Sequence, residues 1–534
     1  MKRLIFVSTR IALFGFLFSE TVLFAQVAED DLAFPEIFSD PISLYADALG
    51  QFSRPISSSV PETQSFFNQG FQLMYAFAKV EATRSFREAQ KYDPNCAICY
   101  WGEAWTWGSY LNGAMRIDEA PHAYSAMQNA LKRLNHASPK EQAFIKAMAV
   151  RYVEDFDPEK RLVQDEAYAE EMKKLAELYP NDLDAATLYA EALFIMEPRR
   201  GYRDIEDPDV QRIHAILEDI LATDIKHPGA CHLYIHATES TVEPGKAEPC
   251  AEYLGNAIPG ASHINHMPSH TWNEIGRWGD SVRANLQAWH SDQKAATGQG
   301  VAIYPSHNLH MLLFSASNDG QSAIAIRAGK DYTKITGDSL YETLTMLRFG
   351  RFDEILDVPT PSEGDFTLGV WDFARGYAHL RGGESDFAQL YLERVRVRAE
   401  SSEARFRWHS VSDLLNIVAG ILEGEIYRQN RDFSEAIDAF ERAVELEDAL
   451  NYDEPESLPF DSRHWLGALF LEIERYSDAE QVYREELKDH PHNGWSLFGL
   501  LKALEAQGKN SSEVEVSFKD SWARADTWIQ SSRF

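Results

Sequence analysis

The chain has 534 residues, of which 44% are hydrophobic and 25% are charged, as in a folded protein that is too long for one compact core. Its 83 acidic and 51 basic residues give a net charge of −32, which argues against nucleic acid and anionic membranes, because both require basic patches. The acidic balance is compatible with metal cations. The simpler explanation is an acidic surface that keeps a large protein in solution.

Residues 1–25 have the pattern of a signal peptide. Three basic residues in the first ten precede an apolar run, Ile11–Phe18, and Ala25 supplies a small residue before the expected cleavage point. The apolar run is shorter than a membrane span, and no later stretch approaches about 18 uncharged apolar residues. We therefore expect a periplasmic or secreted protein with no membrane contact after signal cleavage. An uncleaved anchor is the alternative.

Residues 26–60 are rich in Pro, Ser and Asp, which predicts an irregular segment with short helices at most. From Thr63 onwards, apolar residues recur with a period of about 3.6 in segments broken by Gly, Pro, Asn or Asp. Alternating strand patterns are scarce. The fold class predicted from these patterns is all-α.

The helical segments repeat with a period of about 34 residues. Small, aromatic and proline residues recur at equivalent offsets in residues 63–96, 417–450 and 460–493; in the first of these they are Phe66, Gly70, Leu73, Ala82, Phe86, Ala89 and Pro94. This pattern resembles the tetratricopeptide repeat (TPR) family. The resemblance implies antiparallel helix pairs stacked in an α-solenoid with a concave groove. We divide the chain into N-terminal repeats (63–227), histidine-rich repeats (228–339) and C-terminal repeats (340–534).

The histidine-rich repeats hold eight of the 17 histidines of the chain. In the TPR family the first helix of each repeat lines the groove, and registers set by Gly, Ala and Pro positions put eight potential ligands on that face. They are His232, His236, Glu239, His263, His266, His270, His307 and His310. His263 precedes Pro268, where we expect its helix to begin, and His290 falls on a second helix. The string HMPSH at 266–270 is similar to one in uncharacterised bacterial proteins of this repeat class, a grouping that implies no activity.

Imidazoles at this spacing are typical of sites for transition metals such as Cu, Zn or Fe. One hypothesis is therefore an exported metal-binding protein, compatible with a metalloenzyme, in which Glu239 acts as a ligand, an orienting group or a general base. The alternative is a scaffold without chemistry that binds peptide or protein partners in the groove. The histidines would then be hydrogen-bonded core residues or line a peptide groove.

The chain has four cysteines, at positions 96, 99, 231 and 250. Export permits disulfides, and Cys231 with Cys250 is the predicted pair, because the two lie on the two helices of one repeat. Cys96 and Cys99 form a C-x-x-C pattern, but no βαβ pattern surrounds them, so a thioredoxin-like role has little support.

Overall fold

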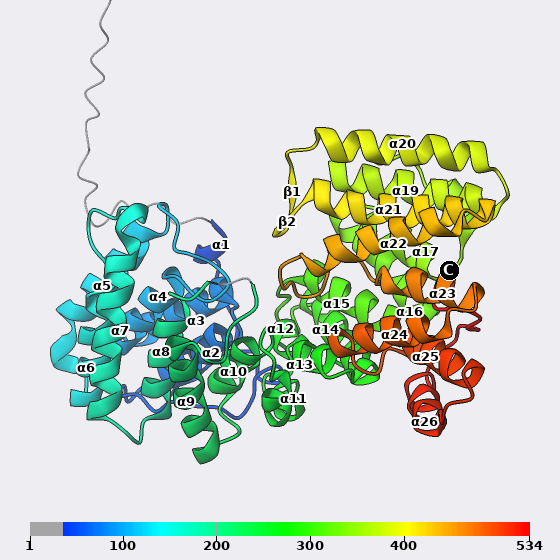
Figure 1. Ribbon diagram of the computed structural model, residues 1–534. Coiled ribbons are helices and arrows are strands. Elements are labelled where there is room, and N and C mark those ends of the chain that lie inside the picture. Colours follow the sequence, from blue (N-terminus) through cyan, green and yellow to red (C-terminus); the bar gives the residue numbers. More distant parts are fainter. Residues whose placement is uncertain (1–35, 199–200) are drawn as a thin grey trace, which may run out of the picture.

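The computed structural model describes residues 36–198 and 201–534, so the predicted signal peptide lies outside the described residues. The described chain is helical almost throughout, and its strands are a two-residue pair, β1 (Arg405–Phe406) and β2 (His409–Ser410). This confirms the all-α fold. Figure 1 shows two helical lobes, joined by the middle of the chain. No helix within the described residues is both long and apolar enough to cross a membrane.

The N-terminal lobe contains α1 (Glu36–Ser39), α2 (Pro61–Tyr75), α3 (Lys79–Tyr92), α4 (Ala97–Trp107), α5 (Ala120–Lys132), α6 (Pro139–Ala149), α7 (Arg161–Leu178), α8 (Leu183–Phe194) and α9 (Pro208–Thr223). The middle part contains α10 (Pro228–Thr238), α11 (Glu248–Leu254), α12 (Ser262–His266), α13 (Pro268–Glu274), α14 (Trp278–Ala295), α15 (Pro305–Asn318) and α16 (Ser322–Thr336). Short 3-10 helices cover Leu134–His136, Pro158–Lys160 and Pro244–Ala247.

The C-terminal lobe contains α17 (Leu340–Arg348), α18 (Phe352–Asp357), α19 (Asp365–Arg381), α20 (Ser385–Ser401), α21 (Val411–Asn430), α22 (Phe433–Asp448), α23 (Arg463–Glu472), α24 (Tyr476–Asp489), α25 (Gly494–Ala506) and α26 (Ser512–Ser521). In both lobes most helices pack against the helix before and the helix after them. This nearest-neighbour packing defines a TPR-like α-solenoid.

The small residues of the repeat pattern hold the helices close together. The ring of Phe86 on α3 packs against Gly70 of α2 and Gly102 of α4: an added Cβ would collide with the ring at Gly102 and would lie only 3.0 Å from it at Gly70. The ring of Tyr483 on α24 packs in the same way against Gly467 of α23 and Gly499 of α25. An aromatic side chain on the second helix thus fills the space that glycines leave on two first helices, which explains why the pattern sets the register.

The two lobes have separate hydrophobic cores, and these meet at the histidine-rich repeats. One core extends from Ile42 to Ile303 and the other from Val282 to Leu504. The C-terminal repeats fold back onto the middle of the chain: the indole Nε1 of Trp278 donates to the carbonyl oxygen of Pro491 at 3.0 Å, and that of Trp495 donates to Ser317 at 2.9 Å. The predicted groove face is therefore enclosed at the histidine-rich repeats.

Candidate metal centre

Prolines and local caps set the helices that carry the histidines. Pro228, Pro268 and Pro305 are the first residues of α10, α13 and α15, the position where a missing backbone N–H costs a helix nothing. The ring nitrogen Nδ1 of His227 accepts from the backbone N–H of Ala230 at 3.1 Å and caps α10. His263 lies on the short helix α12, which ends just before Pro268. Our expectation that its helix begins only at that proline was wrong, and His263 belongs to the centre.

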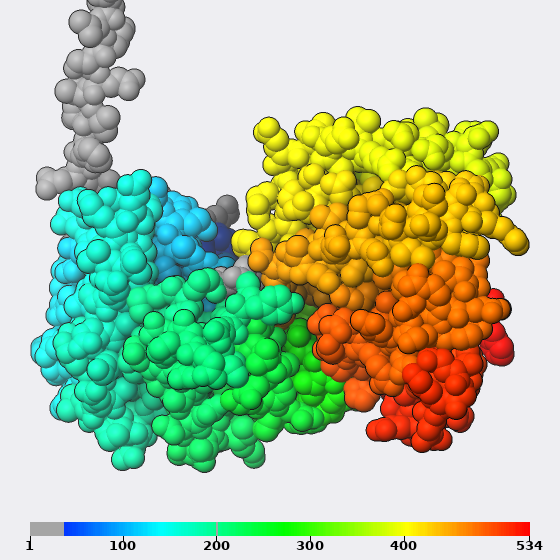
Figure 2. Space-filling view, viewed as in Figure 1, coloured from blue at the N-terminus to red at the C-terminus, as the bar shows by residue number. Residues whose placement is uncertain are grey.

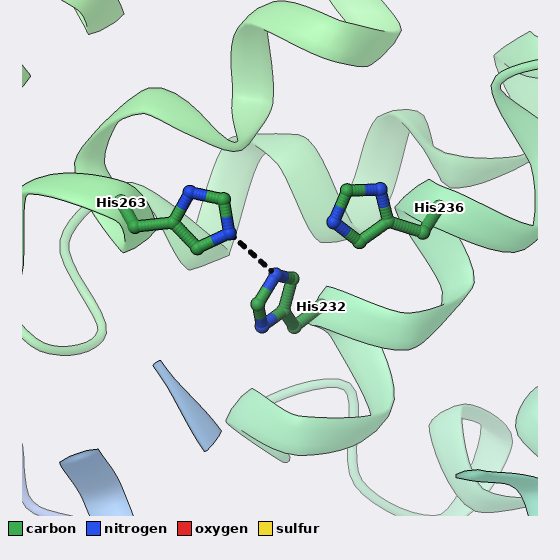
Figure 3. A group of neighbouring side chains, drawn as sticks. All are labelled: His232, His236 and His263. Atoms are coloured by element: carbon green, nitrogen blue, oxygen red, sulfur yellow. Dashed lines mark hydrogen bonds between the residues drawn. The ribbon is translucent and has the colours of Figure 1, made fainter. Parts of the chain in front are cut away.

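The first group of ligand atoms comes from α10 and α12. His232, His236 and His263 are buried, and one ring nitrogen of each lies within 4.8 Å of the others. Figure 3 shows the three imidazoles around a common space. The Nε2 atoms of His232 and His263 are 3.2 Å apart.

The second group comes from α12, α13 and α15. His266, His270 and His307 likewise place one nitrogen each within 4.8 Å of the others, and the Nε2 atoms of His266 and His270 are 2.8 Å apart. The two triads adjoin, because the ring centroids of His236 and His270 are 5.2 Å apart. The sequence prediction that three successive repeats aim their histidines at one place holds for these six residues.

Hydrogen bonds at Nδ1 decide which ring nitrogens carry lone pairs. The Nδ1 of His232 donates to the carbonyl oxygen of Tyr75 at 2.6 Å, and that of His266 donates to Oδ1 of Asn285 at 3.0 Å. The Nδ1 atoms of His236 and His270 donate to the carboxylate of Glu239. Four imidazoles therefore hold their proton at Nδ1 and present a basic Nε2, a tautomer that metal-binding histidines commonly adopt.

Burial favours the neutral form of three of the triad imidazoles. It lowers the pKa of His263, His266 and His307 well below the usual value of 6.5, and neighbouring histidines lower each further. Burial acts in the opposite sense on Glu239 and raises its pKa, but its electrostatic contacts and hydrogen bonds with the two imidazoles of His270 and His236 outweigh burial and hold the pKa of Glu239 well below its usual range. The centre thus combines at least three neutral nitrogen donors with an ionised carboxylate.

Glu454 is a member of the centre that the sequence analysis missed. One of its carboxylate oxygens lies 3.1 Å from Nδ1 of His270 and 3.9 Å from Nδ1 of His236. Glu454 comes from the irregular segment 449–462 between α22 and α23, and no spacing pattern links it to the histidines. Together with Glu239 it forms a further group of four possible ligands, His236, Glu239, His270 and Glu454.

His310 departs from the prediction. The guanidinium Nη1 of Arg407, on the turn between β1 and β2, donates to its Nδ1 at 2.9 Å, and its ring stacks on Tyr341 at a centroid distance of 4.0 Å. His310 lies about one turn beyond His307 on α15, where it faces α17 and the β-hairpin instead of α13. Within the described part of the chain, no group of possible metal ligands includes His310.

Both cysteine pairs form disulfides. Cys231 is joined to Cys250, which confirms the predicted link between the two helices of one repeat. Cys96 is joined to Cys99, a pair for which the C-x-x-C pattern was noted but no disulfide was predicted. The Cys231–Cys250 disulfide links α10, which carries His232 and His236, to α11.

Comparisons with known proteins do not assign a family: no family model and no curated protein matches. Among solved structures, the human IFIT1 dimer with m7Gppp-AAAA is 11% identical, covers 80% of this chain and 90% of its own, and has a TM-score of 0.30. Yeast Tom70 is 10% identical over 87% and 92%, with a TM-score of 0.27. The Cut9–Hcn1 structure is 14% identical over 87% and 76%, with a TM-score of 0.29. At such scores no functional argument follows, and the class defined here is a TPR-like α-solenoid with a buried histidine centre.

Proposed function

We propose that this chain is an exported TPR-like protein that binds two transition-metal ions, one in each histidine triad. The observation that carries the proposal is the pair of facing Nε2 atoms in each triad. Where Nδ1 holds the proton on both rings, as in His266 and His270, two lone pairs point at each other at hydrogen-bond distance with no proton between them. A cation removes this repulsion, and burial disfavours a proton in that role.

The donor set fits Zn, Cu or Fe. Ligands at about 2.0–2.1 Å from one ion lie roughly 3–4 Å apart, and the facing Nε2 atoms of His232 and His263 are at 3.2 Å. Three imidazoles leave a fourth position open, and an ion there would polarise a substrate or activate water. The carboxylate of Glu239 accepts from both His236 and His270, so we assign it to positioning these imidazoles. As a general base it would first have to release them.

Two further observations bear on the wider proposal. Disulfides persist in oxidising compartments, so the pairs Cys96–Cys99 and Cys231–Cys250 support export, as does the signal-like start of the sequence. A peptide scaffold would use the same helix face, and there the triad side chains are buried, except for the half-buried His307. The metal-binding function therefore has the stronger structural support.

Elemental analysis of protein purified without a metal-affinity tag tests the proposal. After supplementation with Zn, Cu or Fe, we expect two equivalents of one metal, falling to one in His232→Ala and in His266→Ala. His290→Ala is the matched control, because His290 is exposed on the second helix α14. Less than one equivalent in the wild-type protein would contradict metal binding. Full metal content in both triad variants would contradict the ligand assignment.

A further inference from the structure

A cavity of about 740 Å³ adjoins the metal centre, with His270 and Glu454 in its wall. Its other walls come from distant parts of the chain: residues 202–203 and 240–244, the end of α13, the segment 449–462 and the end of α24. Figure 2 shows the surface hollowed where the N-terminal and C-terminal lobes approach each other. The volume lies within the range of about 300–1,000 Å³ that is typical of small-molecule sites.

The cavity wall is strongly acidic. Among the described residues that line it, nine are Asp or Glu and three are Arg or Lys. Two of the three basic residues are paired with acidic lining residues: Arg463 with Asp448 at 2.7 Å and Lys488 with Glu485 at 2.6 Å. Of the other seven carboxyl groups, Glu456 lies 3.1 Å from Nε2 of His490, a further basic group of the wall, and Asp453 pairs with Arg407. The five that are left outnumber Arg203, so the wall stays acidic and favours a positively charged ligand.

Two carboxyl groups of the wall have raised pKa values because they are buried near other acidic groups. Burial raises the pKa of Glu274 to about 8, with the charges of Glu239 and Glu456 acting in the same direction. Burial and the charge of Glu486 raise the pKa of Asp461 to about 7. No ion pair of Glu274 with Arg or Lys occurs within the described ranges. A ligand cation would stabilise the ionised form of these two carboxyl groups.

The wall also offers aromatic faces and a buried hydroxyl group without a partner. The rings of Trp278 and Phe314 are 6.1 Å apart, and those of Tyr202 and Tyr452 are 5.7 Å apart. Aromatic faces attract cations and pack against hydrocarbon. Ser457 is only 3% exposed, and its Oγ has no hydrogen-bond partner in the part of the chain that the structure describes. A buried hydroxyl of this kind is normally satisfied, which points to a polar ligand group.

We propose that this cavity binds a small organic cation, a protonated amine, with its ammonium group among the carboxylates and its hydrocarbon part against Trp278 and Phe314. One consequence rests on the proposed metal function: if an ion is bound near His270, amines are the substrate class that the cavity presents to it. Binding itself requires no metal.

Calorimetric titration with 1,4-diaminobutane tests the proposal, with 1,4-butanediol as the uncharged ligand of the same length. We expect the diol to bind at least tenfold more weakly than the diamine. Glu274 and Glu447 both line the cavity, and the double variant Glu274→Gln/Glu447→Gln should weaken diamine binding about tenfold, which corresponds to about 1.4 kcal/mol. Glu218→Gln, at an exposed position of α9 outside the cavity, is the matched control and should bind as the wild type does.

Three results would overturn the cavity proposal: equal affinity for diol and diamine, unchanged diamine binding by a folded double variant, or binding of Mg²⁺ or Ca²⁺ in place of the diamine. If the double variant does not fold, the comparison of diamine with diol on the wild-type protein decides. The variant His232→Ala/His266→Ala separates the two proposals, because it should lose metal and still bind diamine. If the wild-type protein binds diamine but takes up no metal, the metal proposal is contradicted and the cavity proposal is supported.

Discussion

Glu239, directly after α10, accepts a hydrogen bond from Nδ1 of His270 on α13, 31 residues further along the chain. Its other carboxylate oxygen accepts from Nδ1 of His236 at 2.9 Å. One buried carboxylate thus orients an imidazole of each triad, so the two proposed ion sites share a positioning group.

Replacing Glu239 with Gln should weaken metal binding without removing a proposed ligand. An amide oxygen accepts from only one imidazole, and the amide N–H₂ group opposes the Nδ1 proton of the other. Loss of such an orienting partner typically costs about 10–100-fold in metal affinity. Competition with a chelator measures the change, and Glu218→Gln is the control. Unchanged affinity in Glu239→Gln would contradict the positioning role.

Replacing His310 with Phe should leave the metal content at the wild-type value. A phenyl ring can keep the stacking on Tyr341, and Arg407 keeps its bonds to the carbonyl oxygens of Glu454 and Pro455 and its ion pair with Asp453. In parallel, His307→Ala should lose one equivalent. Elemental analysis distinguishes the two histidines of α15. Loss of metal from His310→Phe would show that this residue belongs to the centre.

Replacing Gly276 with Ala should destabilise the contact between the histidine-rich and C-terminal repeats. Gly276 has φ of +75°, and an added Cβ would collide with the carbonyl oxygen of Pro491. Gly298 has φ of +74° and open space around it, so Gly298→Ala carries the backbone cost of roughly 1–2 kcal/mol without the collision. The apparent unfolding temperature should fall further in Gly276→Ala. An equal fall in unfolding temperature in the two variants would mean that the backbone around Pro491 moves to accommodate the added Cβ without a cost in stability.

The stability of the N-terminal lobe should depend on pH through Glu191. Burial raises its pKa from 4.5 to about 7, although nearby Arg151 and the hydrogen bond from Trp105 act in the opposite direction. Between pH 4.5 and pH 7 the unfolded chain releases this proton while the folded chain keeps it. The folded state therefore loses stability as pH rises through this window, by about 1.4 kcal/mol for each pKa unit.

Glu191→Gln removes this titration and keeps an acceptor for the indole N–H of Trp105, which lies 3.2 Å from the carboxylate. We expect the variant to match the wild type near pH 5 and to be more stable at pH 8. Apparent unfolding temperatures at the two pH values measure the difference. Glu177→Gln, at an exposed position of α7, should show no such change between the two pH values. A variant that gains nothing at pH 8 would contradict the raised pKa.

The helix pairs and their register were predictable from the sequence because both depend on local features. Phe86 and Gly70 recur at set offsets, since an aromatic ring on one helix requires a glycine on its neighbour. The same register put His232, His236, His266, His270 and His307 on one face of three first helices. Neighbouring repeats in a solenoid contact each other directly, so this local information was enough to bring them together.

Only the tertiary structure showed that the histidines form two separate triads and that the C-terminal lobe covers them. The division into two triads depends on the angle between successive repeats, which side-chain spacing does not encode. Glu454 reaches the centre and Arg407 reaches His310 because the C-terminal lobe curves back over the middle of the chain. That curvature sums small rotations over many repeats, so its result appears only in the assembled fold.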